Sequence, residues 1–158
     1  MKSINERKLN CIEFFMPMEP PTITAQEHEV AVGKNGKPFF YDPPELKDAK
    51  KKLTAHLMAH RPGEPFMGPV ELVATWCFPW PKSRQKDFCI LQKALPLTSM
   101  PDHEWRMERP DTDNLDKLLK DCMTKCGFWK DDAQVCREII EKYNAWIPGI
   151  RIRVTRLA

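Results

Sequence analysis

Hydrophobic and polar residues alternate with two different periods along the chain, and these periods predict strands and helices in turn. Apolar segments bounded by turn residues predict four strands in the first half, at residues 11–18, 29–32, 38–41 and 70–78. The sequence Gly33-Lys34-Asn35-Gly36 predicts a hairpin turn between the second and the third of them. Between residues 45 and 60, leucine and alanine recur at helical spacing behind Pro43 and Pro44, which predicts a helix.

The last third of the chain has the sharpest pattern. Four apolar residues between Leu115 and Met123 recur at helical spacing, and we expect Asp113 to be the N-cap of this helix and Gly127 its stop. Strands are predicted at residues 135–146 and 150–157. In the last of these, isoleucine and valine alternate with arginine and threonine, so one face is apolar and the other basic.

Residues 82–108 interrupt this pattern. The segment carries several basic residues, prolines at positions 96 and 101, and a short helical pattern at residues 87–94. Long excursions of this kind in compact proteins are often functional. Because the chain has no internal repeats, we expect residues 1–158 to form a single compact α+β domain. A mixed β-sheet would pack against helices, and residues 82–108 would be an inserted excursion.

Composition is that of an ordinary globular protein: 42% of the 158 residues are hydrophobic and 30% are charged. No run approaches the roughly 18 apolar residues of a membrane span, and residues 1–10 do not look like a secretory signal. The six cysteines are scattered without a Cys-x-x-Cys pair. We therefore expect a cytoplasmic protein with reduced cysteines and no membrane partner. The net charge of +3 permits DNA binding without indicating it.

Two aspartates come directly before the predicted helix at residues 115–123. Pro110 disfavours helix at Arg109, so we expect an extended approach in which Asp111 and Asp113 point to the same side. Two carboxylates on one face repel each other unless a cation lies between them, and Mg²⁺ accepts carboxylate and water ligands. The alternative is that Asp113 only caps the helix while Asp111 is a solvated loop residue, and the pair alone does not decide between the two.

A lysine and a second pair of aspartates extend the hypothesis of a metal site. Lys117 follows Asp113 by one helical turn, so it either stabilises negative charge beside a metal and a phosphate or forms an ordinary ion pair. Asp131 and Asp132 come directly after an aromatic turn. Because adjacent side chains in extended backbone point in opposite directions, we expect one of them to join the metal site and the other to cap or support it.

Together these motifs resemble the core of the RusA family of Holliday-junction resolvases. The first, Asp111-Thr112-Asp113-Asn114-Leu115, resembles the family's Asp-x-Asp-Asn-Leu helix start. The second, Gly127-Phe128-Trp129-Lys130-Asp131-Asp132-Ala133-Gln134-Val135, resembles its Gly-x-x-x-Asp-Asp-x-Gln-Val turn. The resemblance is strong over residues 110–135 and looser towards the N-terminus. Residues 82–108 depart from the shortest members of the family and look like an insertion.

The resemblance implies an enzyme, a Mg²⁺-dependent crossover junction endodeoxyribonuclease of recombination and repair, from a family with many phage and prophage members. Such an enzyme acts as a homodimer, resolves four-way DNA junctions by paired phosphodiester hydrolysis and needs no nucleotide cofactor. The resemblance places catalytic and metal-binding roles on Asp111, Asp113 and Asp132, the essential lysine at Lys117, and a second-tier metal role on Asp131. A nuclease for flaps or forks and a non-catalytic junction-binding protein remain as alternatives.

DNA contact is expected from cations that neutralise phosphates. The candidates are Lys50, Lys51, Lys52, Lys82, Arg84, Lys86, Arg109, Arg151 and Arg153. Of these, Lys82, Arg84 and Lys86 in the excursion are our first candidates for DNA contact. The alternative for each is an ordinary solvated charge or one that protects a strand edge.

The predicted helix after Asp113 also suggests a composite site. A helix that reaches about Cys126 covers roughly 20 Å at 1.5 Å per residue, which carries the chain well away from Asp113 before Asp132 appears. We therefore expect each subunit's Asp132 to lie beside the Asp111 and Asp113 of a partner related by a twofold axis.

Overall fold

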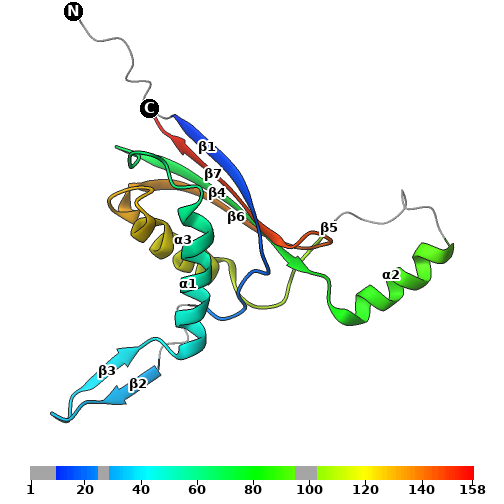
Figure 1. Ribbon diagram of the computed structural model, residues 1–158, viewed down its shortest axis with the longest axis horizontal. Helices are drawn as coiled ribbons and strands as arrows, with labels where there is room; N and C mark the ends of the chain where they lie inside the picture. The colour runs from blue at the N-terminus through cyan, green and yellow to red at the C-terminus, as the bar shows by residue number, and fades with distance from the viewer. Residues whose placement is uncertain (1–9, 25–28, 95–102) are drawn as a thin grey trace, which may run out of the picture.

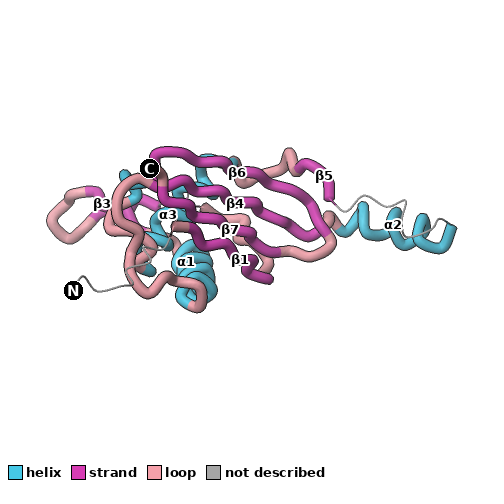
Figure 2. Tube along the Cα trace, turned by 90° about the horizontal axis from the view of Figure 1, so that it is seen from above, coloured by secondary structure: helices cyan, strands magenta, loops and turns pink. Residues whose placement is uncertain are grey.

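A five-stranded mixed sheet with the order β1-β7-β4-β6-β5 forms the centre of the computed structural model, which describes residues 10–24, 29–94 and 103–158. Its strands are β1 (Cys11–Pro17), β4 (Val70–Pro79), β5 (His103–Trp105), β6 (Val135–Ala145) and β7 (Gly149–Arg156). Figure 2 shows them side by side. β4 and β6 run parallel, whereas the other neighbours are antiparallel. A parallel pair needs a crossover connection, and the connection from β4 to β6 includes helix α3 (Thr112–Cys126).

Helix α1 (Pro44–Met58) and α3 cover one face of this sheet (Figure 1). Alternate residues of β4 and β7 turn towards the helices and are buried, which for β7 confirms the predicted period of two. They meet leucines of both helices in one core, whose members include Leu46, Leu53, Leu57, Leu72, Ala74, Trp76, Leu115, Leu118, Leu119, Ile150, Ile152 and Val154. Each fully buried aliphatic side chain contributes about 1.5–3 kcal/mol relative to an exposed one. This packing fixes α3 over the sheet and thereby positions the site described below.

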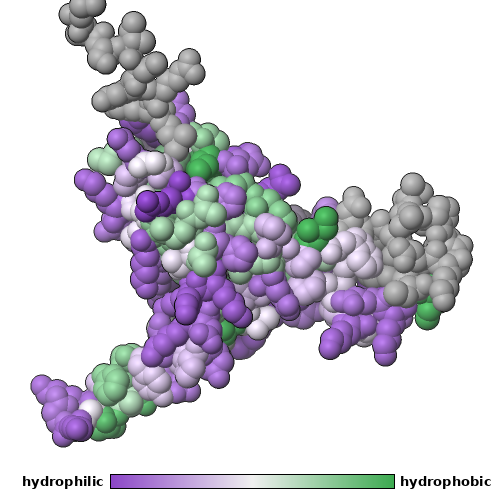
Figure 3. All heavy atoms as spheres, in the orientation of Figure 1, coloured by the Kyte–Doolittle hydropathy of each residue, from purple (hydrophilic) through white to green (hydrophobic). Residues whose placement is uncertain are grey.

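The strands predicted in the first half, the Gly33–Gly36 hairpin and the proline-led helix are all confirmed. Pro43 is the N-cap of α1 and a proline occupies its first turn. The hairpin of β2 (Glu29–Val32) and β3 (Pro38–Tyr41) extends away from the sheet (Figure 1). Its valines and phenylalanines are exposed, with Phe40 at 75%, and Figure 3 shows apolar surface along it.

The segment 82–108 contains more regular structure than its sequence predicted. Helix α2 (Lys82–Ala94) begins five residues before the helical pattern at 87–94, and it extends away from the sheet (Figure 1). The short β5 pairs with β6 at the edge of the sheet. A three-residue strand is too short for a period of two to be recognised, so β5 could not be predicted. In the part of the chain that the structure describes, no helix is long and apolar enough to cross a membrane.

Candidate active site

Hydrogen bonds from two cationic side chains, those of Lys142 and Arg106, hold the turn that leads into α3 against β6. Lys142 Nζ donates hydrogen bonds to the carbonyl oxygens of Glu108 and Pro110, both at 2.8 Å. Arg106 donates to the carbonyl oxygen of Arg109 at 3.0 Å and to Asn144 Oδ1 at 2.9 Å. These bonds saturate carbonyl groups that have no helical partner, and they fix the position at which α3 starts.

Helix α3 begins two residues earlier than predicted, because its N-cap is Asp111, so the assignment of Asp113 as N-cap is wrong. Asp111 has the extended backbone of an N-cap residue, φ −74° and ψ 154°, and its carbonyl oxygen accepts from Leu115 N at 3.1 Å. Its side chain makes no capping hydrogen bond. Asp113 therefore lies inside the first helical turn, where the positive end of the helix favours a carboxylate. Capping does not account for either side chain, and both residues are exposed.

The turn after α3 is anchored by buried aromatic residues. Gly127 ends the helix with φ +82°, as predicted from its position. Phe128 and Trp129 are buried, and Trp129 Nε1 donates to Thr124 Oγ1 at 2.8 Å. The carbonyl oxygen of Phe128 accepts from Phe66 N at 2.8 Å. The chain is thus turned back towards α3 and enters the short 3₁₀ helix η2 (Asp132–Gln134).

Asp131 and Asp132 have different surroundings. Asp131 caps η2, because its Oδ1 accepts from Ala133 N at 2.8 Å. Gln134 completes a capping box: its Oε1 accepts from the backbone N–H groups of Lys130 and Asp131. The same side chain donates through Nε2 to the carbonyl oxygens of residues 66 and 68, at 3.0 and 2.9 Å. Four hydrogen bonds of one glutamine therefore fix the turn that carries Asp132.

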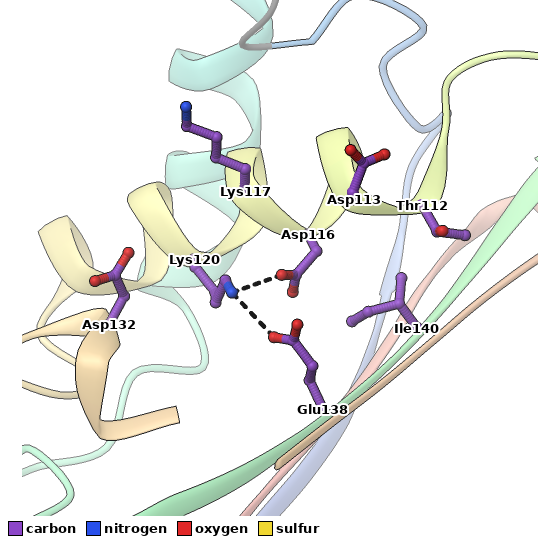
Figure 4. Close-up of a pocket in the computed structure, with 8 residues that line it drawn as sticks. All are labelled: Thr112, Asp113, Asp116, Lys117, Lys120, Asp132, Glu138 and Ile140. Atoms are coloured by element: carbon purple, nitrogen blue, oxygen red, sulfur yellow. Dashed lines mark hydrogen bonds and ion pairs between the residues drawn. The ribbon is translucent and has the colours of Figure 1, made fainter. Parts of the chain in front are cut away.

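A pocket of about 490 Å³ lies where α3, η2 and β6 meet (Figure 4). It is lined by Thr112, Asp113, Asp116, Lys117, Lys120, Asp132, Glu138 and Ile140. Asp113, Lys117 and Asp132, singled out from the sequence, all contribute to it, whereas Asp111 at the N-cap is not among the lining residues. Within the described residues, no group of three or more histidine, cysteine, aspartate or glutamate side chains is placed to hold a metal ion. The metal-binding triad therefore stays a prediction.

The composite site expected from the length of α3 stays a prediction. Because the aromatic turn reverses the chain, Asp132 lies beside α3 of its own chain, and Asp113 and Asp132 line the same pocket. The length of α3 is as expected, but the return path through η2 was not foreseen from its sequence. The homodimer itself remains a prediction.

The pocket also contains an ion-pair cluster that the sequence analysis missed. Lys120 Nζ lies 2.6 Å from Asp116 Oδ2 and 2.9 Å from Glu138 Oε2 (Figure 4). Asp116 is only 5% exposed, and its second carboxylate oxygen, Oδ1, is buried without a hydrogen-bond partner. The spacing of Asp116 and Lys120, four residues apart on a helix, was a signal for the pair. The contribution of Glu138 required the register of β6.

Burial sets the protonation behaviour of this cluster. It raises the pKa of Asp116 to about 6, although the hydrogen bond and the charge of Lys120 act in the opposite direction. Burial alone would lower the pKa of Lys120, but its bonds to Asp116 and Glu138 outweigh this and raise it. Lys120 is therefore a firmly held ammonium group at neutral pH.

The candidate DNA-binding cations are distributed around the molecule rather than in the pocket. Lys82, Arg84 and Lys86 are exposed on α2, and Arg84 pairs with Glu104 at 3.0 Å. Arg151 and Arg153 lie on the sheet face opposite the helices, within 3.4 Å of Glu13 and 3.8 Å of Glu71 respectively. On α1, Lys50 is half-buried against Asp42, whereas Lys51 and Lys52 are exposed. Arg109 is exposed just before α3.

Comparison with known proteins gives a consistent result over most of the chain. A family model described as Endodeoxyribonuclease RusA matches residues 18–155, which include every residue that lines the pocket. A protein of Lactococcus phage r1t named crossover junction endodeoxyribonuclease rusA is 29% identical over 145 residues, 92% of this chain and 98% of its own. The uncharacterized protein YqaN of Bacillus subtilis (strain 168) is 27% identical over 150 residues, 95% of this chain and 99% of its own.

Proposed function

Because the chain belongs to the RusA family of endodeoxyribonucleases, we propose that it resolves four-way DNA junctions by paired, Mg²⁺-dependent phosphodiester hydrolysis. The observation that carries this proposal is the pocket that Asp113 and Lys117 of α3 and Asp132 of η2 line together. The name of the phage r1t relative, a crossover junction endodeoxyribonuclease, supports the choice of substrate. In this proposal the protein acts in the cytoplasm, in DNA recombination and repair.

The donor groups of the pocket fit a hard divalent cation. Mg²⁺ in phosphate-processing sites is bound through one or two carboxylates, with water and substrate phosphate as the other ligands. Asp113 and Asp132 supply two carboxylates to the pocket, and Asp111 would join them from the N-cap of α3. When bound there, Mg²⁺ would lower the pKa of an attacking water and neutralise charge on the phosphate. Asp131, engaged as a cap, supports the turn rather than the metal.

Other residues of the pocket act on the phosphate directly. Lys117 follows Asp113 by one helical turn, so its ammonium group would stabilise the negative charge that develops during hydrolysis. The start of α3 adds the partial positive charge of its first N–H groups, which favours a phosphate in the same place. Lys142 and Arg106 act as positioning residues, because they hold the turn from which α3 starts.

We further propose that the protein works as a homodimer, so that two pockets face the two strands that a junction resolvase must cut. Phosphate contacts would come from Lys82, Arg84, Lys86, Arg109, Arg151 and Arg153. The excursion at residues 82–108 would be an insertion whose helix α2 reaches a DNA arm beyond the sheet. Its extension away from the sheet supports this role (Figure 1).

Cleavage assays with matched substrates test the proposal. The wild-type protein with Mg²⁺ should cut a mobile four-way junction and leave a linear duplex of the same sequence intact, with flap and fork substrates as further arms. Asp113→Asn should keep the fold and junction binding but lower the cleavage rate by about 100-fold or more. Asp121→Asn, on the same helix but outside the pocket, is the matched control. Cleavage by Asp113→Asn at the wild-type rate would refute the site, and preference for flaps or forks would refute the substrate.

A further inference from the structure

We infer that Lys120 is a built-in cation of the pocket, which neutralises Asp116 and Glu138 and thereby limits the pocket to a single divalent metal ion per chain. The inference rests on the proposed function, because it assumes that a metal ion binds beside Asp113 and Asp132. The inference goes beyond the proposed function in two ways. It assigns a role to Asp116, Lys120 and Glu138, which lie outside the family motifs, and it sets the number of bound metal ions at one per chain.

The position of Lys120 is the first observation. Its ammonium nitrogen bridges two carboxylates from different elements, Asp116 on α3 and Glu138 on β6, at 2.6 and 2.9 Å. Its side chain is 21% exposed, so it is not a freely solvated lysine on a helix surface. Figure 4 shows the ammonium group between the two acids, on the sheet side of α3, while Lys117 points away from them. A bridging cation between two carboxylates is the arrangement that a metal ion would otherwise adopt there.

The charge of the pocket is the second observation. Its lining contains four carboxylates, of Asp113, Asp116, Asp132 and Glu138, and two ammonium groups, of Lys117 and Lys120. With all six ionised, the net charge is two negative units, which one divalent cation neutralises. Without Lys120 the net charge would be three negative units, and two carboxylates would face each other without a counter-charge. Like charges in close contact favour the binding of a cation.

The unpartnered oxygen of Asp116 is the third observation. Oδ1 of this buried residue has no hydrogen-bond partner, although Oδ2 is bound to Lys120. Burial of an unsatisfied carboxylate oxygen is unfavourable, so this residue is not explained by stability alone. An oxygen of this kind, in a pocket lined by other acids, is a ready ligand for a second ion once Lys120 no longer occupies the site.

The consequence concerns the chemistry of hydrolysis. Two-metal nucleases hold their ions about 3.5–4 Å apart and use both to stabilise the attacking and the leaving oxygen. Here Lys120 occupies the place between Asp116 and Glu138 that a second ion would need. One metal ion held by Asp113 and Asp132 would then share the work with the fixed ammonium groups of the pocket.

The test is to count bound ions. Mn²⁺ is titrated into the full-length protein without DNA, and the free ion is measured by electron paramagnetic resonance. The wild-type protein should bind one Mn²⁺ per chain, and Lys120→Met should bind two. Lys125→Met, which removes an exposed lysine from the last turn of α3, is the matched control and should bind one. The double variant Asp116→Asn/Lys120→Met removes one carboxylate of the new site and should return to one.

Each outcome decides a different point. Two ions in the wild-type protein, or one ion in a folded Lys120→Met, would overturn the inference while leaving the proposed function intact. No ion in the wild-type protein would overturn the proposed metal site, and the inference with it. Lys120→Gln, which keeps a hydrogen-bond donor but not the charge, replaces Lys120→Met if circular dichroism shows that the methionine variant is unfolded. If neither variant folds, the wild-type count alone decides.

Discussion

Replacement of Asp116 by asparagine should make the protein more stable at neutral pH, although it removes one member of an ion pair. In the folded protein, burial raises the pKa of this carboxyl from 3.8 to about 6. A tenfold change in acid dissociation corresponds to about 1.4 kcal/mol, so ionised Asp116 lowers the free energy of unfolding by at most about 3 kcal/mol, and by less where solvent screens its charge. Asparagine has nearly the same shape, carries no charge and still accepts a hydrogen bond from Lys120.

The sign of this effect depends on pH. The folded state holds the proton of Asp116 more tightly than the unfolded state, so stability falls as pH rises from about 4 to about 6 and stays lowered above that. Below pH 4 the carboxyl is protonated in both the folded and the unfolded state, so it no longer lowers the free energy of unfolding. The advantage of Asp116→Asn should therefore be about 1–3 kcal/mol at pH 8 and should shrink towards zero at pH 4.

Guanidinium unfolding at pH 4, 5, 6, 7 and 8, with EDTA present to exclude divalent ions, measures this difference. Asp121→Asn, on the same helix but outside the pocket, should stay within about 0.5 kcal/mol of wild type throughout. Two results would refute the reasoning: Asp116→Asn less stable than wild type at pH 8, or a stability advantage that does not change with pH. Either would show that the ionised carboxyl of Asp116 does not lower the stability of the folded protein. A buried acid that lowers stability is expected at a functional site rather than in a structural core.

Two further predictions concern the turn at η2 and the DNA-binding surface. Gln134→Ala removes four hydrogen bonds, so it should lower the free energy of unfolding in urea by about 2–4 kcal/mol and slow junction cleavage through displacement of Asp132. Full stability of this variant would show that the capping box is dispensable. Replacing Lys82, Arg84 and Lys86 with alanine should reduce the slope of log Kd against log salt by about 2, because Arg84 is already paired with Glu104. The slope is measured by fluorescence anisotropy. An unchanged slope would show that these three residues do not contact DNA and would make Arg151 and Arg153 the next candidates.

Most strands and helices could be predicted because their burial follows a simple period. β7 is the clearest case: Ile150, Ile152 and Val154 are buried, and Arg151 and Arg153 are exposed, as the alternation requires. The helix start was misplaced by two residues, at Asp113 instead of Asp111, because both aspartates are acceptable N-caps and backbone conformation alone distinguishes them.

The pocket could be predicted in part. The residues with adjacent signals in the sequence, Asp113, Lys117 and Asp132, do line it. The cluster around Lys120 could not be found in the same way, because Glu138 belongs to it only through the register of β6 against β4 and the position of α3 above the sheet. Strand order is a property of long-range packing, and a local pattern does not contain it.

The order of the strands also has a consequence for biosynthesis. β1 pairs with β7 along its whole length, and β7 follows every other strand of the sheet in the sequence. A nascent chain therefore leaves the ribosome with β1 unpaired and cannot complete its sheet until β7 has been synthesised. A premature stop before β7 would leave the edges of β1 and β4 open and would remove three buried residues from the core. Such a product would aggregate rather than persist as a partly active nuclease, so only chains translated through β7 would reach DNA.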